Sequence, residues 1–347
     1  MKAAQSAVAK HLSDAGWTVE WQDFTTSPKR LYGVSVGATG LGWLALLSFP
    51  LMVGPFSYTT VLWVTISVAV IVALLSIGVA KYGWGLSVEN VPSKNLVANL
   101  GTKPTVWFVA HFDSKAQKAS MAGRVVSVVL AGLGVALLAV ELILRAGGPI
   151  EHIFVLPGVL LCVIGTYRLT GPPLVGESPG AVDNASGIVA SLAAASELAK
   201  DRDVGILVTG AEEFGMEGAR HFVASRPARS KNFLRFVNFD GIDDRGRLNV
   251  SLHGSSRSGW SRLAAGAVGR KWVERGGRLR RAALPVGIFV DGGVLQRSGA
   301  EGITVARGTW DTLKVVHTPE DMPARMDPLA AAAVGVTVAE ALRPVLG

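Results

Sequence analysis

A long stretch without charged side chains constrains the fold of this chain more than any other feature. Residues 31–80 include no Asp, Glu, Lys, Arg or His. Pro50 and the Gly54-Pro55 pair divide the stretch into two pieces, and each piece supplies the roughly 20 apolar residues that cross a bilayer. Buried core helices are the alternative, but two adjacent uncharged segments of this length are rare in soluble domains. We therefore predict a transmembrane helical hairpin at residues 31–80.

A second apolar region predicts another transmembrane hairpin at residues 120–170. One apolar run extends from Val125 to Leu144, and another extends from Ile153 to Tyr167. The last run is short and contains Pro157, so we expect it to tilt, to break or to depend on a flanking basic side chain. Core helices are again the alternative. The chain as a whole is 49% hydrophobic and 17% charged, which is too apolar for an ordinary soluble domain.

Basic side chains near the ends of the predicted spans indicate their orientation. Two hairpins return the chain to its starting side, so residues 1–30, 81–119 and 171–347 share one compartment and are predicted to form one discontinuous domain. The Lys and Arg residues that flank the spans on this side are Lys29, Arg30, Lys81, Lys115, Lys118, Arg124 and Arg168. Arg145 is the only Lys or Arg residue at the two tips, so the positive-inside rule places the domain in the cytoplasm. The single cysteine, Cys162, lies in a predicted span, which permits a reducing compartment.

Strands and helices alternate in the rest of the chain. The N-terminal residues lack a signal-peptide pattern and predict a helix followed by a strand at 17–21. Predicted strands then cover 95–100, 105–110, 204–209, 233–239, 248–252 and 302–306, and predicted helices cover 3–15, 185–199, 216–224, 258–275 and 330–342. Such alternation indicates an α/β sheet with helices on both faces, in which binding sites form at the carboxyl ends of strands.

Acidic and imidazole side chains follow several of these strands. His111 follows one strand, Glu212 and Glu213 follow a second, and Asp240 follows a third. In an extended segment His111 and Asp113 point the same way, so Asp113 can accept the other ring proton of a metal-binding His111. The adjacent Glu212 and Glu213 diverge. We therefore expect one of them to bind metal and the other to take a proton from metal-activated water.

Three further residues complete a site for two metal ions. Asp183 has two carboxylate oxygens, which can bridge two ions a few ångströms apart. Asp240 and His317 are expected to complete the shells of the two ions. Such a pair of ions lowers the pKa of a shared water and stabilises the oxyanion that forms when water attacks a carbonyl. The pattern thus predicts a two-metal hydrolase.

The candidate residues lie in segments that together resemble the M28 family of zinc-dependent aminopeptidases. The matching segments are AHFDS at 110–114, GAVDNASG at 180–187, GAEEFG at 210–215, NFDG at 238–241 and VHTPED at 316–321. The resemblance extends over most of the chain outside the apolar regions. It implies a mixed, mostly parallel sheet flanked by helices, and an exopeptidase that removes N-terminal residues from peptides with a free amino terminus.

The resemblance also implies a role for each residue. His111 and Asp240 would bind one zinc ion, Glu213 and His317 would bind the other, and Asp183 would bridge them. Glu212 would be the general base that acts on metal-activated water, and Asp113 would orient His111. Carboxylate and imidazole ligands also accept Co²⁺ or Mn²⁺.

The chain departs from the family in the position of the second hairpin, which is inserted between Asp113 and Asp183. About 11 residues link Asp113 to Arg124, which limits the site to at most roughly 40 Å from the bilayer edge. We therefore predict a membrane-embedded aminopeptidase whose cleft opens near the membrane and receives amphipathic or membrane-released peptides. One alternative is a metal-dependent amidohydrolase for N-acyl or cyclised substrates. Another is a catalytically silent membrane receptor or scaffold, although the intact Glu212 argues against it.

The formal net charge of +8 indicates an anionic partner or a solvated basic surface. Basic residues concentrate in one segment, at Arg257, Arg262, Arg270, Lys271, Arg275, Arg278, Arg280 and Arg281. This segment is expected either to bind anionic lipid headgroups or to form a solvated helix face. No nucleic-acid partner is expected, because the sequence shows no reader motif and no basic surface interleaved with aromatic residues.

Overall fold

A mixed eight-stranded sheet forms the centre of this chain, whose computed structural model describes residues 2–87, 89–226, 234–254, 259–281, 283–284 and 287–346. The strands are β1 (Thr18–Thr26), β2 (Val91–Leu100), β3 (Val106–His111), β4 (Val204–Thr209), β5 (Arg235–Ile242), β6 (Arg247–His253), β7 (Leu279–Arg281) and β8 (Glu301–Gly308). They lie in the order β1-β2-β4-β3-β5-β8-β6-β7. The block β4-β3-β5-β8 is parallel, β1 and β2 are antiparallel at one side of it, and β6 is antiparallel to β8 at the other. The predicted mixed, mostly parallel α/β sheet is confirmed.

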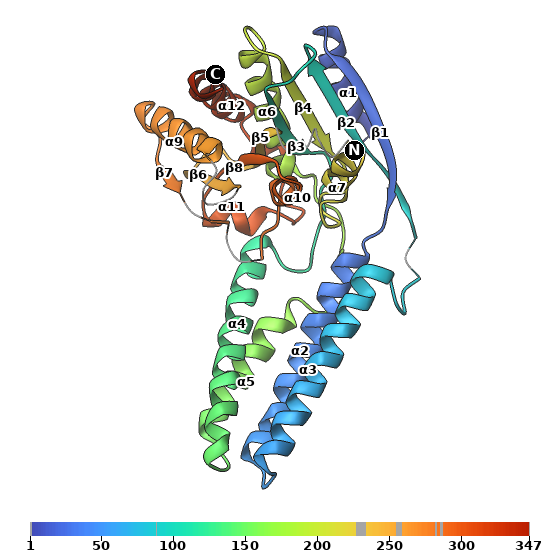
Figure 1. Ribbon diagram of the computed structural model, residues 1–347, viewed down its shortest axis with the longest axis vertical. Helices are drawn as coiled ribbons and strands as arrows, with labels where there is room; N and C mark the ends of the chain where they lie inside the picture. The colour runs from blue at the N-terminus through green and yellow to red at the C-terminus, as the bar shows by residue number, and fades with distance from the viewer. Residues whose placement is uncertain are drawn as a thin grey trace.

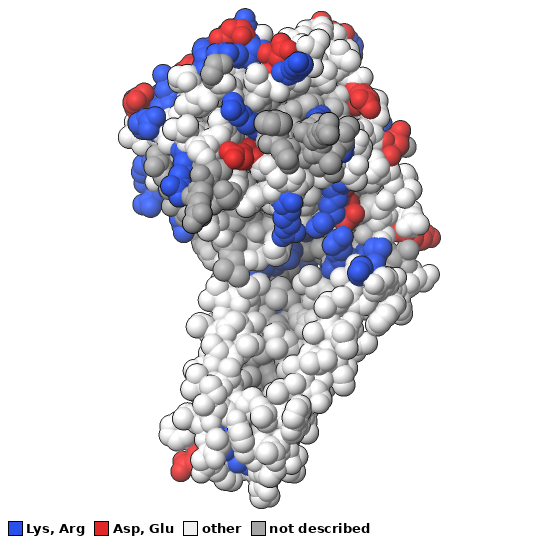
Figure 2. Space-filling model, viewed as in Figure 1, with Lys and Arg blue, Asp and Glu red and all other residues white. Residues whose placement is uncertain are grey.

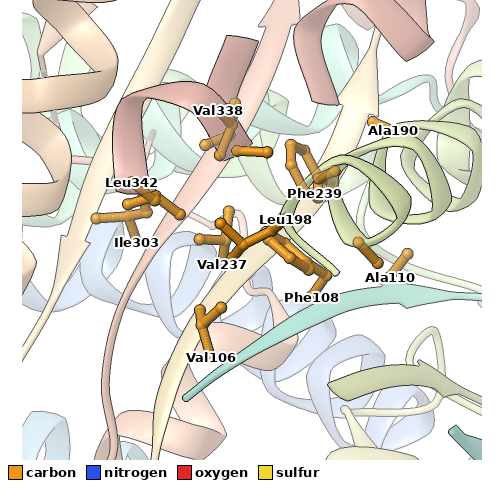
Figure 3. Packing of buried hydrophobic residues seen from close by; sticks show 14 of the residues in the cluster. Val106, Phe108, Ala110, Ala190, Leu198, Val237, Phe239, Ile303, Val338 and Leu342 are labelled. Atoms are coloured by element: carbon orange, nitrogen blue, oxygen red, sulfur yellow. The ribbon is translucent and has the colours of Figure 1, made fainter. Parts of the chain in front are cut away.

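Helices cover both faces of this sheet (Figure 1). The helices that pack on one face are α1 (Lys2–Asp14), α6 (Ser186–Leu198), α9 (Gly259–Glu274) and α12 (Pro328–Leu342). The other face is covered by α7 (Glu217–Ala224) and α10 (Asp291–Arg297), which share a smaller apolar cluster with the sheet. Figure 3 shows part of the larger cluster, where Phe108 and Val237 of the sheet lie beside Val338 and Leu342 of α12.

The apolar character of α12 reflects this packing. Residues 328–345 are long and apolar enough to cross a membrane by length and composition. However, Val334, Val338 and Leu342 are fully buried in the core of the domain. Gly335 lies so close to α6 that an added Cβ would be 2.1 Å from the carbonyl oxygen of Ala190. We therefore assign α12 to the sheet domain, where the sequence predicts it.

Four other helices extend from the domain as two hairpins (Figure 1). They are α2 (Lys29–Val53), α3 (Tyr58–Tyr82), α4 (Met121–Leu144) and α5 (His152–Tyr167). The first three are long and apolar enough to span a membrane, whereas α5 is an apolar helix of 16 residues. At 1.5 Å per residue, α5 is about 24 Å long, so the predicted fourth span falls short of a typical hydrocarbon core.

The outer surface of the two hairpins is apolar. Large side chains such as Trp43, Trp63, Ile77, Ile143 and Phe154 are more than half exposed. Figure 2 shows that charged side chains are nearly absent from this part of the molecule, and that Lys and Arg side chains gather where it meets the domain. Exposed apolar surface of this extent marks an interaction with a membrane or another protein.

The hairpins pack against each other as well as within themselves. Leu51, Met52 and Val61 of the first hairpin form one buried cluster with Val155 and Val159 of α5. At the tips, the guanidinium of Arg145 donates hydrogen bonds to the carbonyl oxygens of Gly54 and Phe56. The two hairpins therefore form one helical unit.

Element boundaries differ from the predictions by a few residues. The predicted strand 95–100 begins earlier, at Val91, because it continues its pairing with β1 along the whole length of that strand. The predicted strand 233–239 is observed as 235–242, and Phe233 lies outside the described residues. The short elements β7, α10 and α11 (Trp310–Val315) were not predicted, because runs of three to seven residues carry too little periodicity.

Candidate metal centre

The predicted site residues come from neighbouring elements at one edge of the sheet. His111 ends β3, Asp240 lies near the end of β5, and Glu212 and Glu213 follow the end of β4. These strands are adjacent and parallel, so their carboxyl ends meet at one edge. Two loops bring the remaining residues to this edge: Asp183 lies in the turn that precedes α6, and His317 follows α11.

The structure brings five predicted metal ligands into two overlapping groups. One group is His111, Asp183 and Asp240, and the other is Asp183, Glu213 and His317, each with its candidate ligand atoms within 4.8 Å of one another. Nε2 of His111 lies 3.1 Å from Oδ1 of Asp183, and Nε2 of His317 lies 3.1 Å from its Oδ2. Nε2 of His317 also lies 3.1 Å from Oε1 of Glu213. Asp183 therefore presents one oxygen to each group.

The remaining ring nitrogen of His111 identifies its tautomer. Nδ1 lies 2.9 Å from the backbone carbonyl oxygen of Asp113, an acceptor only, so Nδ1 carries the proton. In the neutral ring, the lone pair of Nε2 then points toward the carboxylates of Asp183 and Asp240. A cation between these groups would replace repulsion with attraction, and metal-binding histidines are commonly oriented by such a hydrogen bond.

Asp113 acts on the site in a different way from the one predicted. Its carboxylate lies 3.9 Å from Nδ1 of His111, beyond hydrogen-bond distance. Instead, Oδ1 accepts a hydrogen bond from the backbone N–H of Glu212, and Oδ2 accepts one from the N–H of Glu213, each at 3.0 Å. Asp113 thus orients His111 through its carbonyl group and the glutamate pair through its side chain.

A second carboxylate holds the backbone at Asp183. Oδ1 of Asp321 accepts from the N–H of Val182 at 2.7 Å, and Oδ2 accepts from the N–H of Asp183 at 3.1 Å. Asp321 belongs to the VHTPED segment, and no role was predicted for it from the sequence. The segment itself was the available signal, because the acid lies four residues after His317.

Two more residues, Lys115 and Asp291, lie beside the site, and no role in it was predicted for them from the sequence. Nζ of Lys115 lies 2.5 Å from Oε2 of the buried Glu213, and the side chain of Lys115 is only 9% exposed. Asp291, at the start of α10, accepts a hydrogen bond from the hydroxyl of Thr209 at 2.5 Å. Lys115 directly follows the AHFDS segment, and the contact depends on how the chain turns after β3, which no spacing predicts.

The electrostatics of the site favour a bound cation. Burial opposes the charged form of both imidazoles, yet nearby carboxylates raise the pKa of His111 well above its ordinary value and raise that of His317. Burial would also raise the pKa of Asp183, but the imidazoles of these two histidines beside it lower it well below its usual range. Burial and neighbouring carboxylates raise the pKa of Asp240 to about 7. The cluster thus attracts positive charge.

Unpaired buried atoms and local backbone conformation also distinguish this region. Oδ1 of Asp183 and Oε1 of Glu213 are buried without a hydrogen-bond partner, as is Nδ1 of His317. Ala211 and His317 have left-handed backbone conformations with φ of 54° and 67°, which is uncommon for residues other than glycine. The unpaired oxygens and imidazole nitrogens are the donor types that zinc prefers, so the residues present fit a metal centre.

The sequence model of peptidase family M28 matches residues 169–342, which is half of the chain. The chain belongs to peptidase family M28. The matched part of this M28 protein contains Asp183, the two glutamates, Asp240 and His317. No curated protein matches its sequence.

Solved structures resemble the fold of this M28 protein at low sequence identity. A glutaminyl cyclase from Fimbriiglobus ruber has a TM-score of 0.54 and 14% identity, with 99% of this chain and 87% of that chain covered. A Zn-dependent exopeptidase from Parabacteroides distasonis has a TM-score of 0.50 and 14% identity, with coverage of 98% and 88%. A zinc aminopeptidase from Bacillus subtilis has a TM-score of 0.47 and 18% identity, with 74% of this chain covered. The M28 protein spans 52% of that aminopeptidase.

Proposed function

We propose that this M28 protein is a membrane-embedded di-zinc aminopeptidase that removes N-terminal residues from peptides. The observation that carries the proposal is the pair of buried ligand groups that share Asp183. His111 and Asp240 would hold one ion, Glu213 and His317 would hold the other, and Asp183 would bridge them. When bound, the two ions would polarise the substrate carbonyl and lower the pKa of the attacking water.

Glu212 is the proposed general base. It is buried, its backbone is held by Asp113, and its carboxylate belongs to neither ligand group. Burial raises the pKa of Glu212 well above its ordinary value, which suits a group that must both accept and return a proton. Its carboxylate would take a proton from the attacking water and deliver it to the leaving amine.

The hairpins would cross the membrane and place this site at its surface. The backbone N–H of Gln117 donates to the carbonyl oxygen of His317 at 3.0 Å, and the N–H of Met121 donates to that of Val316 at 3.3 Å. Met121 begins α4, so the second hairpin starts beside a proposed metal ligand. This arrangement supports peptides at the membrane surface, amphipathic or membrane-released, as the substrates.

The proposed division of the chain follows from the same arrangement. Residues 1–30, 81–119 and 171–347 would form the peptidase domain, and residues 31–80 and 120–170 would form the two hairpins. The two hairpins together form a helical stalk. The basic side chains where this stalk meets the domain support a cytoplasmic domain (Figure 2). The bilayer is thus the proposed partner of the apolar stalk.

A second candidate activity is that of a metal-dependent amidohydrolase acting on N-acyl or cyclised substrates. Its support is the glutaminyl cyclase fold, which covers almost the whole chain. The same ligands and the same base would serve such a reaction. A silent scaffold would not need to keep Glu212 beside a complete set of ligands.

Zinc analysis and amino-acid release test these functions together. We expect the purified full chain to bind two zinc ions and to release the first residue from unblocked peptides only. The Glu212→Gln variant is expected to keep its zinc and to lose about 10²- to 10⁴-fold in kcat, the range typical of a removed general base. Cleavage of blocked substrates alone would favour the amidohydrolase. Bound zinc without any turnover would favour the scaffold.

A further inference from the structure

A cavity beside the ligand groups has an unusual lining. Its volume is about 570 Å³, within the range of ligand-binding pockets. Asp183 and Asp240 form part of its wall, so the cavity is continuous with the proposed metal centre. Apolar side chains such as Ile288, Trp310 and Leu313 line other parts, and the wall also contains four arginines: Arg247, Arg278, Arg280 and Arg307.

Strand alternation explains why polar side chains form one wall of this cavity. Leu248 and Val250 of β6 are buried in the main core, so Arg247 and Asn249 point to the opposite face of the sheet. Asn249 is paired with Arg280 of β7. Arg247, Asn249 and Arg280 therefore lie on the same face at neighbouring positions.

The part of the cavity lining formed by Arg247, Arg278 and Arg280 is called the arginine wall here. It lies within reach of a substrate bound at the ligand groups. Only β8 separates β6 from β5, the strand that carries Asp240. Neighbouring strands are about 4.8 Å apart, so the backbone of β5 is separated by roughly 10 Å from that of β6 and by roughly 14 Å from that of β7. An arginine side chain spans much of the shorter distance. A charged group a few bonds away from the reacting carbonyl would therefore meet the guanidinium groups.

Three of the four arginines carry charge that the protein itself does not neutralise. Arg307 is half-buried, stacks on Trp272 and lies in the field of two aspartates, Asp243 and Asp244. By contrast, no ion pair or hydrogen bond involves the side chains of Arg247, Arg278 and Arg280 in the part of the chain that the structure describes. The buried Oδ1 of Asn249, on the same wall, also has no partner.

The rest of the predicted basic segment is arranged differently. Lys271 and Arg275 of α9 form ion pairs with Glu340 of α12, which is on the other face of the sheet. Arg257 lies outside the described residues. The segment is thus not one uniform basic surface. Two exposed arginines, one on β6 and one on β7, instead line the open cavity beside the proposed metal centre.

We propose that Arg247, Arg278 and Arg280 bind a carboxylate of the substrate and so give the site a preference for peptides that carry a carboxylate close to the amino terminus. This inference rests on the proposed peptidase function and specifies its substrate class. Guanidinium groups bind carboxylates through charge-assisted and often bidentate hydrogen bonds. The carboxylate comes either from an acidic side chain near the amino terminus or from the carboxyl terminus of a short peptide.

Isosteric substrates test the charge preference in the zinc-loaded full chain. We expect kcat/KM for Glu-Ala-Ala-amide to exceed that for Gln-Ala-Ala-amide by about tenfold or more, the value of one hydrogen bond to a charged group. Comparison of Gln-Ala with Gln-Ala-amide tests the terminal carboxylate as the source. The variants Arg247→Gln and Arg280→Gln are expected to reduce whichever preference is observed, and higher ionic strength is expected to reduce it too. Arg270→Gln, an exposed substitution on α9, is the matched control and should leave it unchanged.

A binding measurement separates this inference from the proposed function. Titration of zinc-loaded Glu212→Gln protein with the same peptides, followed by tryptophan fluorescence, reports affinity without turnover, because Trp310 lines the cavity. If the wild-type protein cleaves no peptide, but acidic peptides bind more tightly to the Glu212→Gln protein and lose this advantage when Arg280→Gln is added to it, the arginine wall is supported and the peptidase function fails. Equal affinity and equal kcat/KM for charged and neutral peptides would overturn the inference. So would a preference that the arginine variants leave intact.

Discussion

Two carboxylates, those of Asp113 and Asp321, position the backbone segments that carry the proposed metal ligands. Asp113 accepts the N–H groups of Glu212 and Glu213, and Asp321 accepts those of Val182 and Asp183. Both acids are buried. Each carboxylate therefore accepts hydrogen bonds from two backbone N–H groups with defined directions in place of water. The proposed ligands thus depend on residues that would not touch the metal ions.

Replacement of Asp321 tests this positioning role. In Asp321→Asn, the amide can accept only one of the two hydrogen bonds and turns an N–H₂ group toward the other donor. We expect zinc affinity to fall about 10- to 100-fold, as is typical when a residue that orients a metal ligand is changed. Competition with a zinc chelator measures this affinity.

The control is Asp327→Asn at the N-terminal cap of α12, where the amide oxygen of Asn can still accept from the N–H of Leu329. This variant is expected to keep both its thermal stability and its zinc affinity. Equal zinc affinity in Asp321→Asn and wild type would contradict the positioning role.

His253 adds a pH-dependent contribution to stability. Burial lowers its pKa, an effect that the hydrogen bond with Gln296 only partly offsets. Below the ordinary histidine pKa of about 6.5, the unfolded chain takes up a proton more readily than the folded chain. This histidine therefore destabilises the fold as the pH falls below about 6.5 and has no such effect above it.

The variant His253→Gln removes this titration while it keeps a polar side chain beside Thr304. We expect its melting temperature to fall less steeply than that of wild type between about pH 7 and pH 5. Thermal unfolding of both proteins at fixed zinc concentration measures the difference. Parallel pH profiles would show that His253 does not carry the effect.

At the scale of elements, glycines determine how closely the helices of a hairpin approach. An added Cβ at Gly134 of α4 would be 2.4 Å from the backbone nitrogen of Cys162 in α5. At Gly165 of α5 it would be 2.3 Å from the backbone nitrogen of Ala131. Because neither backbone can yield, the two backbones come this close only where the side chain is absent. Small residues at helix contacts are typical of membrane helices.

Labelling of Cys162 reports on this packing, because it is the only cysteine in the chain and is fully buried. Overpacking costs about 1–3 kcal/mol, so Gly134→Leu is expected to increase the labelling rate by a membrane-permeant maleimide about 5- to 150-fold. Gly132→Leu lies on the same helix, and an added Cβ there meets nothing within 4 Å. Cys162 of the Gly132→Leu variant should therefore be labelled at the wild-type rate. Equal rates for both variants would show that α4 and α5 are not held together at Gly134.

At the scale of the whole molecule, the apolar stalk and the sheet domain meet at the proposed metal centre. The linker that leads into α4 is hydrogen-bonded to His317 and Val316. If the four helices cross a membrane, the cavity would therefore lie at a defined depth, close to the surface of the lipid. This arrangement makes the topology of the chain the most direct test of the membrane proposal.

Cysteine substitutions test this topology in a Cys162→Ala background. Thr59 lies at the start of α3 near the hairpin tip, and Ser13 is exposed at the end of α1. We expect an impermeant maleimide to label Thr59→Cys in intact cells and to label Ser13→Cys only after lysis. The reverse pattern would contradict the cytoplasmic placement. Labelling of both positions in intact cells would contradict a chain that crosses the membrane.

Much of this architecture could be predicted because it depends on local patterns. Period-two and period-3.6 hydrophobicity located the main strands and helices, and the uncharged stretch at 31–80 located two long apolar helices. Short elements such as β7 carry too few residues for a pattern. The apolar run at 153–167 was predicted to be short, and helix α5 (His152–Tyr167) has 16 residues.

The site was only partly accessible from the sequence. His111, Asp183, Glu213, Asp240 and His317 were selected by residue type and by their places after strands, and the structure groups their atoms. Their roles as ligands remain a prediction. The atom through which Asp113 acts, and the contact of Lys115 with Glu213, depend on how loops turn. Spacing along the chain carries no information about such turns.

The sequence by itself determined the class of sheet, the apolar hairpins and the family, because these follow from periodicity, composition and short motifs. Only the tertiary structure decided which carboxylates meet in the proposed metal centre and which accept backbone N–H groups, and that Arg247 and Arg280 share one wall of a cavity. The physical reason is that these contacts join residues far apart in the chain. Their geometry depends on strand order and register, which long-range packing sets and which local preference does not encode.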